Sequence, residues 1–135
     1  MLKLLFVGIG GALGAVLRYE LDSLIMGGDL HTFPWGTLAV NLVGCFIIGI
    51  SYKVFYYELL HAHLKNLIIT GFLGALTTFS SYSYATLMLF EQGRMNLGLA
   101  NLLFNNVFGI FFAFLGSRLT GDIINKYFKK VSEGG

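Results

Sequence analysis

The chain has 135 residues, of which 56% are hydrophobic and 12% are charged, and its mean hydropathy is +0.73. Soluble domains carry about 25% charged residues, so the length and composition predict a single integral membrane domain. The net charge of +2 comes without a basic patch interleaved with aromatic residues, which argues against nucleic-acid binding.

A helix needs about 20 mainly apolar residues to cross a bilayer. Stretches that meet this requirement are Leu2–Met26, Trp35–Tyr57, Asn66–Phe90 and Leu97–Leu119, with short connections and a polar tail over residues 120–135. We therefore expect an all-α protein of four membrane-spanning helices in the cell membrane.

Four crossings put both chain termini on one side of the membrane. That side holds Lys3, Lys53, Lys65, Arg118, Lys126, Lys129 and Lys130, whereas the other holds Arg94 and, at the end of the first helix, Arg18. The positive-inside rule then predicts that both termini are cytoplasmic.

Glycines in the first segment predict close helix contact. Gly10 and Gly14 form a small-xxx-small pattern, which lets helix backbones approach in lipid. Catalytic patterns are missing from the sequence: it has no Ser/His/Asp set, no paired carboxylates and no phosphate-cradling loop. We therefore expect no enzyme activity.

Several polar residues fall at membrane depth, where unsatisfied polar groups are costly. Arg18 either pairs with Asp22, one helical turn away, or extends to the headgroups. Asn41 either bonds a neighbouring helix or lines a polar path. Asn101, Asn105 and Asn106 in the fourth segment either join helices or solvate a permeant ion. Such residues favour an oligomer, because four short helices bury little polar surface alone.

The third segment contains the polar stretch GFLGALTTFSSYS, from Gly71 to Ser83. Its hydroxyls can bond back to their own helix while Phe79 and Tyr82 pack against neighbours. Alternatively, the weak helix formers Gly74, Thr77 and Thr78 break the helix and turn carbonyl groups inward, which membranes tolerate only where protein or water shields them. Inward carbonyls suit a hard cation, and aromatic ring edges suit an anion.

These motifs resemble those of the CrcB/Fluc fluoride channels. The stretch GFLGALTTFSSYS is similar to that family's third-helix signature, GGALGAVLRY (Gly10–Tyr19) to its first-helix motif, and WGTLAVNLVGCFIIG (Trp35–Gly49) to its second-helix motif. The resemblance covers all four segments in order.

The resemblance implies an antiparallel dimer with two narrow pores that exports fluoride passively from the cytoplasm. It implies a structural sodium ion held by the backbone carbonyls of Gly74 and Thr77. By the same resemblance, the fluoride pathway includes Asn41, Phe79, Tyr82, Ser83 and Asn106, and Arg18 matches the first-helix arginine. Amide, hydroxyl and ring-edge donors can replace the water shell of fluoride by weak binding at several sites.

The chain departs from the family pattern at particular positions. Tyr82 stands where the second phenylalanine is usual, Ala85 where a glutamate often follows the signature, and the fourth helix lacks a Ser/Thr track after Asn106. The uneven Lys and Arg distribution predicts one preferred orientation. The partner in the dimer is then either a second copy inserted in the opposite sense or an oppositely oriented homologue.

Rival interpretations are a small-multidrug-type dimeric transporter and a non-conducting membrane subunit. The transporter is disfavoured because Glu20 and Asp22 lie near a helix end, whereas proton-coupled members need a carboxylate deep in the membrane. The non-conducting subunit predicts that Asn41 and the aromatic pair serve only packing.

Overall fold

The computed structural model describes residues 1–26 and 33–133, and this part of the chain is helical without strands. The predicted connection between the first two helices lies largely outside the described residues. The helices are α1 (Leu2–Met26), α2 (Trp35–Tyr56), α3 (Ala62–Lys65), the π-helix η1 (Asn66–Leu73), α4 (Gly74–Leu76), α5 (Phe79–Glu91), α6 (Met95–Leu103), the π-helix η2 (Phe104–Phe108) and α7 (Gly109–Glu133).

Within the described chain, three helical stretches are long and apolar enough to cross a membrane: Leu2–Ile25, Trp35–Tyr56 and Met95–Glu133. They correspond to the first, second and fourth predicted segments. The third predicted segment is divided into shorter helices at Thr77 and Thr78, which lie between α4 and α5. The predicted break is therefore present, and it explains why this segment does not form one long helix.

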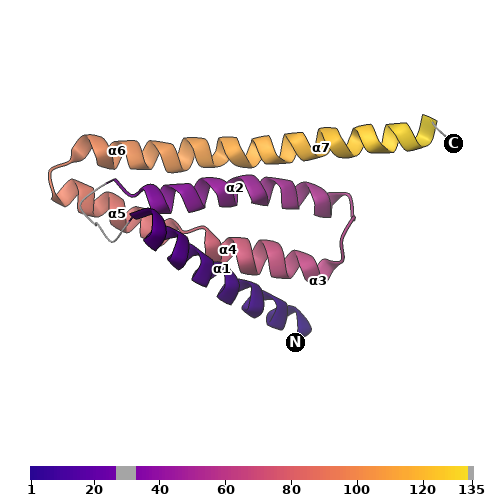
Figure 1. The fold of residues 1–135 in the computed structure, drawn as a ribbon, viewed down its shortest axis with the longest axis horizontal. Helices are drawn as coiled ribbons and strands as arrows, with labels where there is room; N and C mark the ends of the chain where they lie inside the picture. Colours follow the sequence, from indigo (N-terminus) through magenta and orange to yellow (C-terminus); the bar gives the residue numbers. More distant parts are fainter. Residues whose placement is uncertain (27–32, 134–135) are drawn as a thin grey trace.

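The last stretch is longer than a bilayer crossing requires. Helices α6, η2 and α7 follow one another as a rod of 39 residues (Figure 1), which corresponds to about 58 Å at 1.5 Å per residue. A hydrocarbon core is about 30 Å thick, so one end of the rod extends well beyond it. The predicted polar tail is consequently helical as far as Glu133, because α7 simply continues.

Figure 1 shows α2 lying alongside this rod, with α1 and the α3–α4 segment on the other side of α2. Close glycine contacts hold the layers together. A Cβ atom added at Gly10 would overlap the carbonyl of Leu67, and one at Gly14 would overlap the carbonyl of Phe72. The predicted small-xxx-small pattern therefore brings α1 against η1. Gly8, in contrast, faces open space.

Much of the apolar surface of a single chain is uncovered. Only 11% of the most apolar stretch of α1 is buried, and Leu4 and Val16 are 75% and 62% exposed. Large exposed apolar areas mark contact with lipid or with another protein. The arrangement is that of a multi-pass membrane protein whose outer faces meet lipid or a partner.

Candidate functional site

The break in the third segment consists of a pair of extended threonines. Thr77 has φ −76° and ψ 148°, and Thr78 has φ −143° and ψ 118°. Thr78 is also the N-cap of α5, because its Oγ1 accepts a hydrogen bond of 3.1 Å from the Ser81 N–H, as threonine commonly does at this position. Gly74 keeps a helical conformation, so the break begins after it, at the threonines.

Asn41 of α2 forms hydrogen bonds with the backbone at this break. Its Oδ1 accepts a hydrogen bond of 2.8 Å from the Thr78 N–H, and its Nδ2 donates to the Thr78 carbonyl at 3.1 Å. The same Nδ2 donates to Asn105 Oδ1 of η2 at 2.8 Å. Asn41 is only 8% exposed. Buried backbone groups need hydrogen-bond partners. The Asn41 amide therefore replaces the helical hydrogen bonds that the extended backbone at Thr78 has lost.

The hydrogen bonds continue from Asn105 in one direction. Asn105 Nδ2 donates to Asn101 Oδ1 at 2.9 Å, and Asn101 Nδ2 donates to Thr86 Oγ1 at 2.8 Å. The Thr86 hydroxyl in turn donates to the Tyr82 carbonyl at 2.7 Å. We call Asn41, Asn105, Asn101 and Thr86 the amide relay. Asn101 is fully buried, at 0% exposure, and it joins α6 to α5.

Carbonyl groups at the break lose their helical partners. In a continuous helix, the Thr78 N–H would pair with the Gly74 carbonyl, and the Ser81 N–H with the Thr77 carbonyl. Here the Thr78 N–H donates to Asn41 and the Ser81 N–H to the Thr78 hydroxyl. The oxygens of Gly74 and Thr77, which the sequence singled out for a cation, are thus released from helical pairing with these donors.

Arg18 of α1 contacts the same region. Its Nε donates to the Ala75 carbonyl at 3.1 Å, and its Nη1 lies 3.4 Å from Ser81 Oγ. Asp22, the alternative partner, instead accepts a hydrogen bond from the Thr37 hydroxyl at 3.1 Å. Arg18 therefore supports the two halves of the broken segment and places a positive charge beside them.

A cavity of about 170 Å³ lies against the break. Its walls are formed by Asn41, Cys45, Thr77, Thr78, Phe79, Tyr82, Asn105 and Asn106. Four of the five residues predicted for the fluoride pathway thus line one cavity; the fifth, Ser83, is on α5 and is not among the lining residues. The π-helix η2 contributes adjacent asparagines to the same wall, and such wide turns are frequent at functional sites.

The two aromatic residues of the cavity wall, Phe79 and Tyr82, differ in their exposure. The Phe79 and Tyr82 ring centroids are 5.1 Å apart with planes at 78°, so the edge of one ring faces the other. Tyr82 is 6% exposed, whereas Phe79 is 74% exposed. Tyr82 is therefore inside this chain, whereas Phe79 faces the lipid or the partner that surrounds the chain.

Most polar hydrogens in the cavity are already used. Asn41 and Asn105 each donate to two partners within the chain, and Asn106 Nδ2 donates to the Leu102 carbonyl at 2.8 Å and to the Tyr82 hydroxyl oxygen at 3.2 Å. Within the described residues, the phenolic hydrogen of Tyr82 has no acceptor. The Tyr82 hydroxyl is therefore a side-chain donor in this wall that remains available to a ligand.

Sequence reasoning missed part of this arrangement. It singled out Asn101 and Asn105 as residues that join helices or solvate an ion without linking them to Asn41, and it gave Thr86 no role. A signal existed in the one-turn spacing of these asparagines, but the partner on α2 is 64 positions from Asn105. Cys45 reaches the cavity from α2 in the turn after Asn41.

The chain is similar to known membrane proteins over most of its length. The CrcB-like protein family, Camphor Resistance (CrcB), matches residues 5–117. A relative from Salinibacter ruber, named fluoride-specific ion channel FluC, is 47% identical over 117 residues, which cover 87% of this chain and 88% of that protein. A relative with the same name from Thermus thermophilus is 40% identical, over 92% of this chain and 99% of that protein. Another, from Aquifex aeolicus, is 46% identical, over 82% of this chain and 90% of that protein.

Proposed function

This chain belongs to the CrcB-like protein family, and we propose that it forms a fluoride-specific ion channel in the cell membrane. The observation that carries the proposal is the cavity beside the helix break, which gathers Asn41, Phe79, Tyr82 and Asn106. Passive flow through it would lower cytoplasmic fluoride. The relatives are named as ion channels, which are not a class of enzyme, and we assign no catalytic step.

The cavity suits an anion because it is polar without being cationic. Fluoride must exchange its water shell for other donors, and ring edges carry partial positive charge. The hydroxyl of Tyr82 can donate to the ion, while its oxygen accepts from Asn106. The described residues that line the wall include no Lys or Arg, so binding stays weak enough for the ion to leave again.

Asn41 takes a positioning role in this scheme. Its two amide hydrogens point to Thr78 and Asn105, so it shapes the wall along which the ion passes. Through the amide relay, the position of the break is tied to the backbone at Tyr82. Fluoride and Asn41 interact directly only if the ion displaces one of these internal acceptors.

We also propose that the working unit is an antiparallel dimer. Phe79 and α1 are largely uncovered in one chain, and a cavity wall that ends in an exposed ring is incomplete. The partner is a second copy or an oppositely oriented homologue. Labelling tags on both sides of the membrane in cells tests this choice, since equal labelling of the two orientations excludes the requirement for a homologue.

The same dimer would hold a structural sodium ion. The residues fit this role, because the Gly74 and Thr77 carbonyls have lost helical donors to side chains and hard cations prefer oxygen ligands. When bound, the ion would supply positive charge that holds the broken segments of two subunits together. Arg18, bonded to the Ala75 carbonyl, supports the backbone next to these ligands.

Fluoride release from liposomes tests the channel. Purified full-length protein is reconstituted at low density, and release is followed with a fluoride electrode in the presence of sodium. We expect rapid release that the small-multidrug-type alternative does not produce. Absence of release, both from the chain alone and from the chain with an oppositely oriented homologue, contradicts the proposal and leaves a non-conducting subunit.

A further inference from the structure

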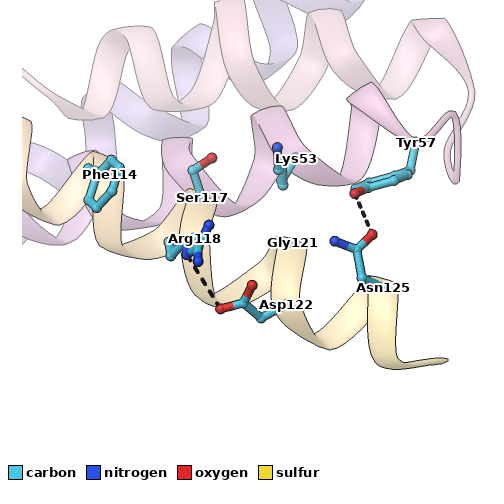
Figure 2. A pocket seen from close by; sticks show the side chains of 8 residues that line it. All are labelled: Lys53, Tyr57, Phe114, Ser117, Arg118, Gly121, Asp122 and Asn125. Atoms are coloured by element: carbon cyan, nitrogen blue, oxygen red, sulfur yellow. Dashed lines mark hydrogen bonds and ion pairs between the residues drawn. The ribbon is translucent and has the colours of Figure 1, made fainter. Parts of the chain in front are cut away.

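A second hollow of about 220 Å³ lies between the last turns of α2 and the middle of α7. Lys53 reaches it from the last turn of α2 and Tyr57 from the residue after that helix, and Ser117, Arg118, Asp122 and Asn125 reach it from α7 (Figure 2). We call it the α2–α7 groove. It shares no lining residue with the cavity beside the break.

The groove is built by close packing and not by chance exposure. Gly121 is buried, and a Cβ atom there would lie 2.9 Å from Lys53 Cε, so the glycine makes room for the lysine stem. The Lys53 ammonium sits 5.1 Å from the Tyr56 ring centroid. The Tyr57 hydroxyl donates to Asn125 Oδ1 at 2.7 Å (Figure 2), which leaves the Asn125 amide hydrogens available to a ligand.

The groove carries more positive than negative charge. Lys53 and Arg118 face a single carboxylate, Asp122, whose Oδ2 lies 3.6 Å from Arg118 Nε. The side chains of this ion pair are 70% and 52% exposed, and exposed pairs bind each other weakly. Asp122 engages the Nε side of the guanidinium, so the outer nitrogens can still donate to an anion.

The position of the groove along α2 and α7 fits the level of a membrane surface. Lys53 is in the last turn of α2, which ends at Tyr56, whereas α7 continues to Glu133. The Tyr57 and Phe128 rings are tilted by 39° with their centroids 6.3 Å apart, and aromatic residues of this kind gather at the interface between lipid and water. Basic pockets between helices at this level can bind lipid headgroups.

We propose that the α2–α7 groove binds a phosphate group, that of an anionic lipid headgroup in the surrounding membrane. The guanidinium fork of Arg118 and the point charge of Lys53 would hold the phosphate oxygens, with the Asn125 amide and the Ser117 hydroxyl as further donors. A free phosphate ion offers the same chemistry, and the experiment separates the two sources. The inference does not depend on fluoride conduction.

Lipid binding to the purified full-length protein, measured by native mass spectrometry, tests the site. Phosphatidylglycerol is titrated onto the wild type, onto Lys53→Gln/Arg118→Gln, and onto Lys126→Gln/Lys129→Gln as a control with the same loss of charge outside the groove. We expect the Kd to rise about fivefold or more in the groove variant, because charge-assisted hydrogen bonds are lost, and less than about twofold in the control.

Inorganic phosphate then identifies the source. If millimolar phosphate displaces phosphatidylglycerol from the wild type but not from the groove variant, free ions also occupy the site; if it does not, the site selects the lipid. The single variant Lys53→Gln controls for misfolding of the double variant, and an unchanged elution volume shows that it is folded. Its Kd for phosphatidylglycerol should also rise. Unchanged binding in both groove variants, or an equal loss in the control, overturns the proposal.

Discussion

The cavity beside the helix break and the α2–α7 groove both present donors to an anion, but they do so with different chemistry. The cavity has amides, hydroxyls and ring edges without a Lys or Arg in its wall, whereas the groove has Lys53 and Arg118. In the cavity most side-chain polar hydrogens are bonded to internal partners, whereas the Tyr82 hydroxyl hydrogen is uncommitted. Neutral, mostly satisfied walls favour passage of an ion, and cationic walls favour its retention.

The largest expected effect is at the centre of the cavity. Asn41→Asp removes the donors to Thr78 and Asn105 and adds negative charge beside the anion path. The carboxylate repels the anion and raises its barrier, and because about 1.4 kcal/mol of barrier changes a rate tenfold, we expect fluoride flux to fall about 100-fold or more.

Liposome efflux measures this loss, with Asn96→Asp at an exposed position of α6 as the matched control. The control should conduct like the wild type. Unchanged flux in Asn41→Asp would place this residue outside the conduction path.

A smaller effect is expected in the amide relay. Thr86→Val keeps the side-chain shape but leaves Asn101 Nδ2 without its 2.8 Å partner in a site of 0% exposure. The free energy of unfolding should fall by about 1–3 kcal/mol, measured by denaturation in mixed micelles. Thr70→Val, at an exposed position of η1, should stay close to the wild type; equal losses in both variants would argue against the relay.

Tyr82→Phe should change affinity more than stability, because the ring and its edge remain. Loss of one hydrogen bond to a charged ligand, partly compensated by the Asn106 amide that it frees, should raise the half-saturating fluoride concentration about three- to tenfold. The control is Tyr84→Phe, since Tyr84 is 64% exposed on the same helix. A half-saturating concentration that does not move in Tyr82→Phe would show that the hydroxyl does not contact the ion.

The smallest effect on conduction is expected from the groove. Lys53→Gln removes a charge that the cavity does not share, so fluoride flux should stay within about twofold of the wild type in liposomes of neutral lipid, where long-range surface charge is screened by salt. A flux loss as large as that of Asn41→Asp would show that the groove belongs to the conduction path and is not a separate site.

Local patterns were sufficient to predict much of this molecule. Hydropathy located α1, α2 and the apolar part of α6–α7, and the weak helix formers near Thr77 located the break. The glycine spacing predicted that the first helix makes a close contact at Gly10 and Gly14, and the structure identifies the partner as η1. These features depend on side chains near each other in the chain, which is why sequence alone reveals them.

Long-range features could not be predicted in the same way. The approach of Asn41 to Thr78 and the turn of Arg18 toward Ala75 depend on how separate helices pack. The helical continuation of α7 to Glu133 escaped a hydropathy criterion because residues 120–133 are polar, yet they hold few helix breakers. The groove at Lys53 escaped notice because its donors come from helices far apart in sequence.

Release of fluoride and chloride from the same population of liposomes tests the central claim most directly. With the wild-type protein and sodium present, the proposed fluoride-specific channel predicts that fluoride leaves rapidly while chloride release stays at the level of protein-free liposomes. Equal release of both anions, or of neither with every partner tested, would contradict a fluoride-selective path along Asn41 and Tyr82.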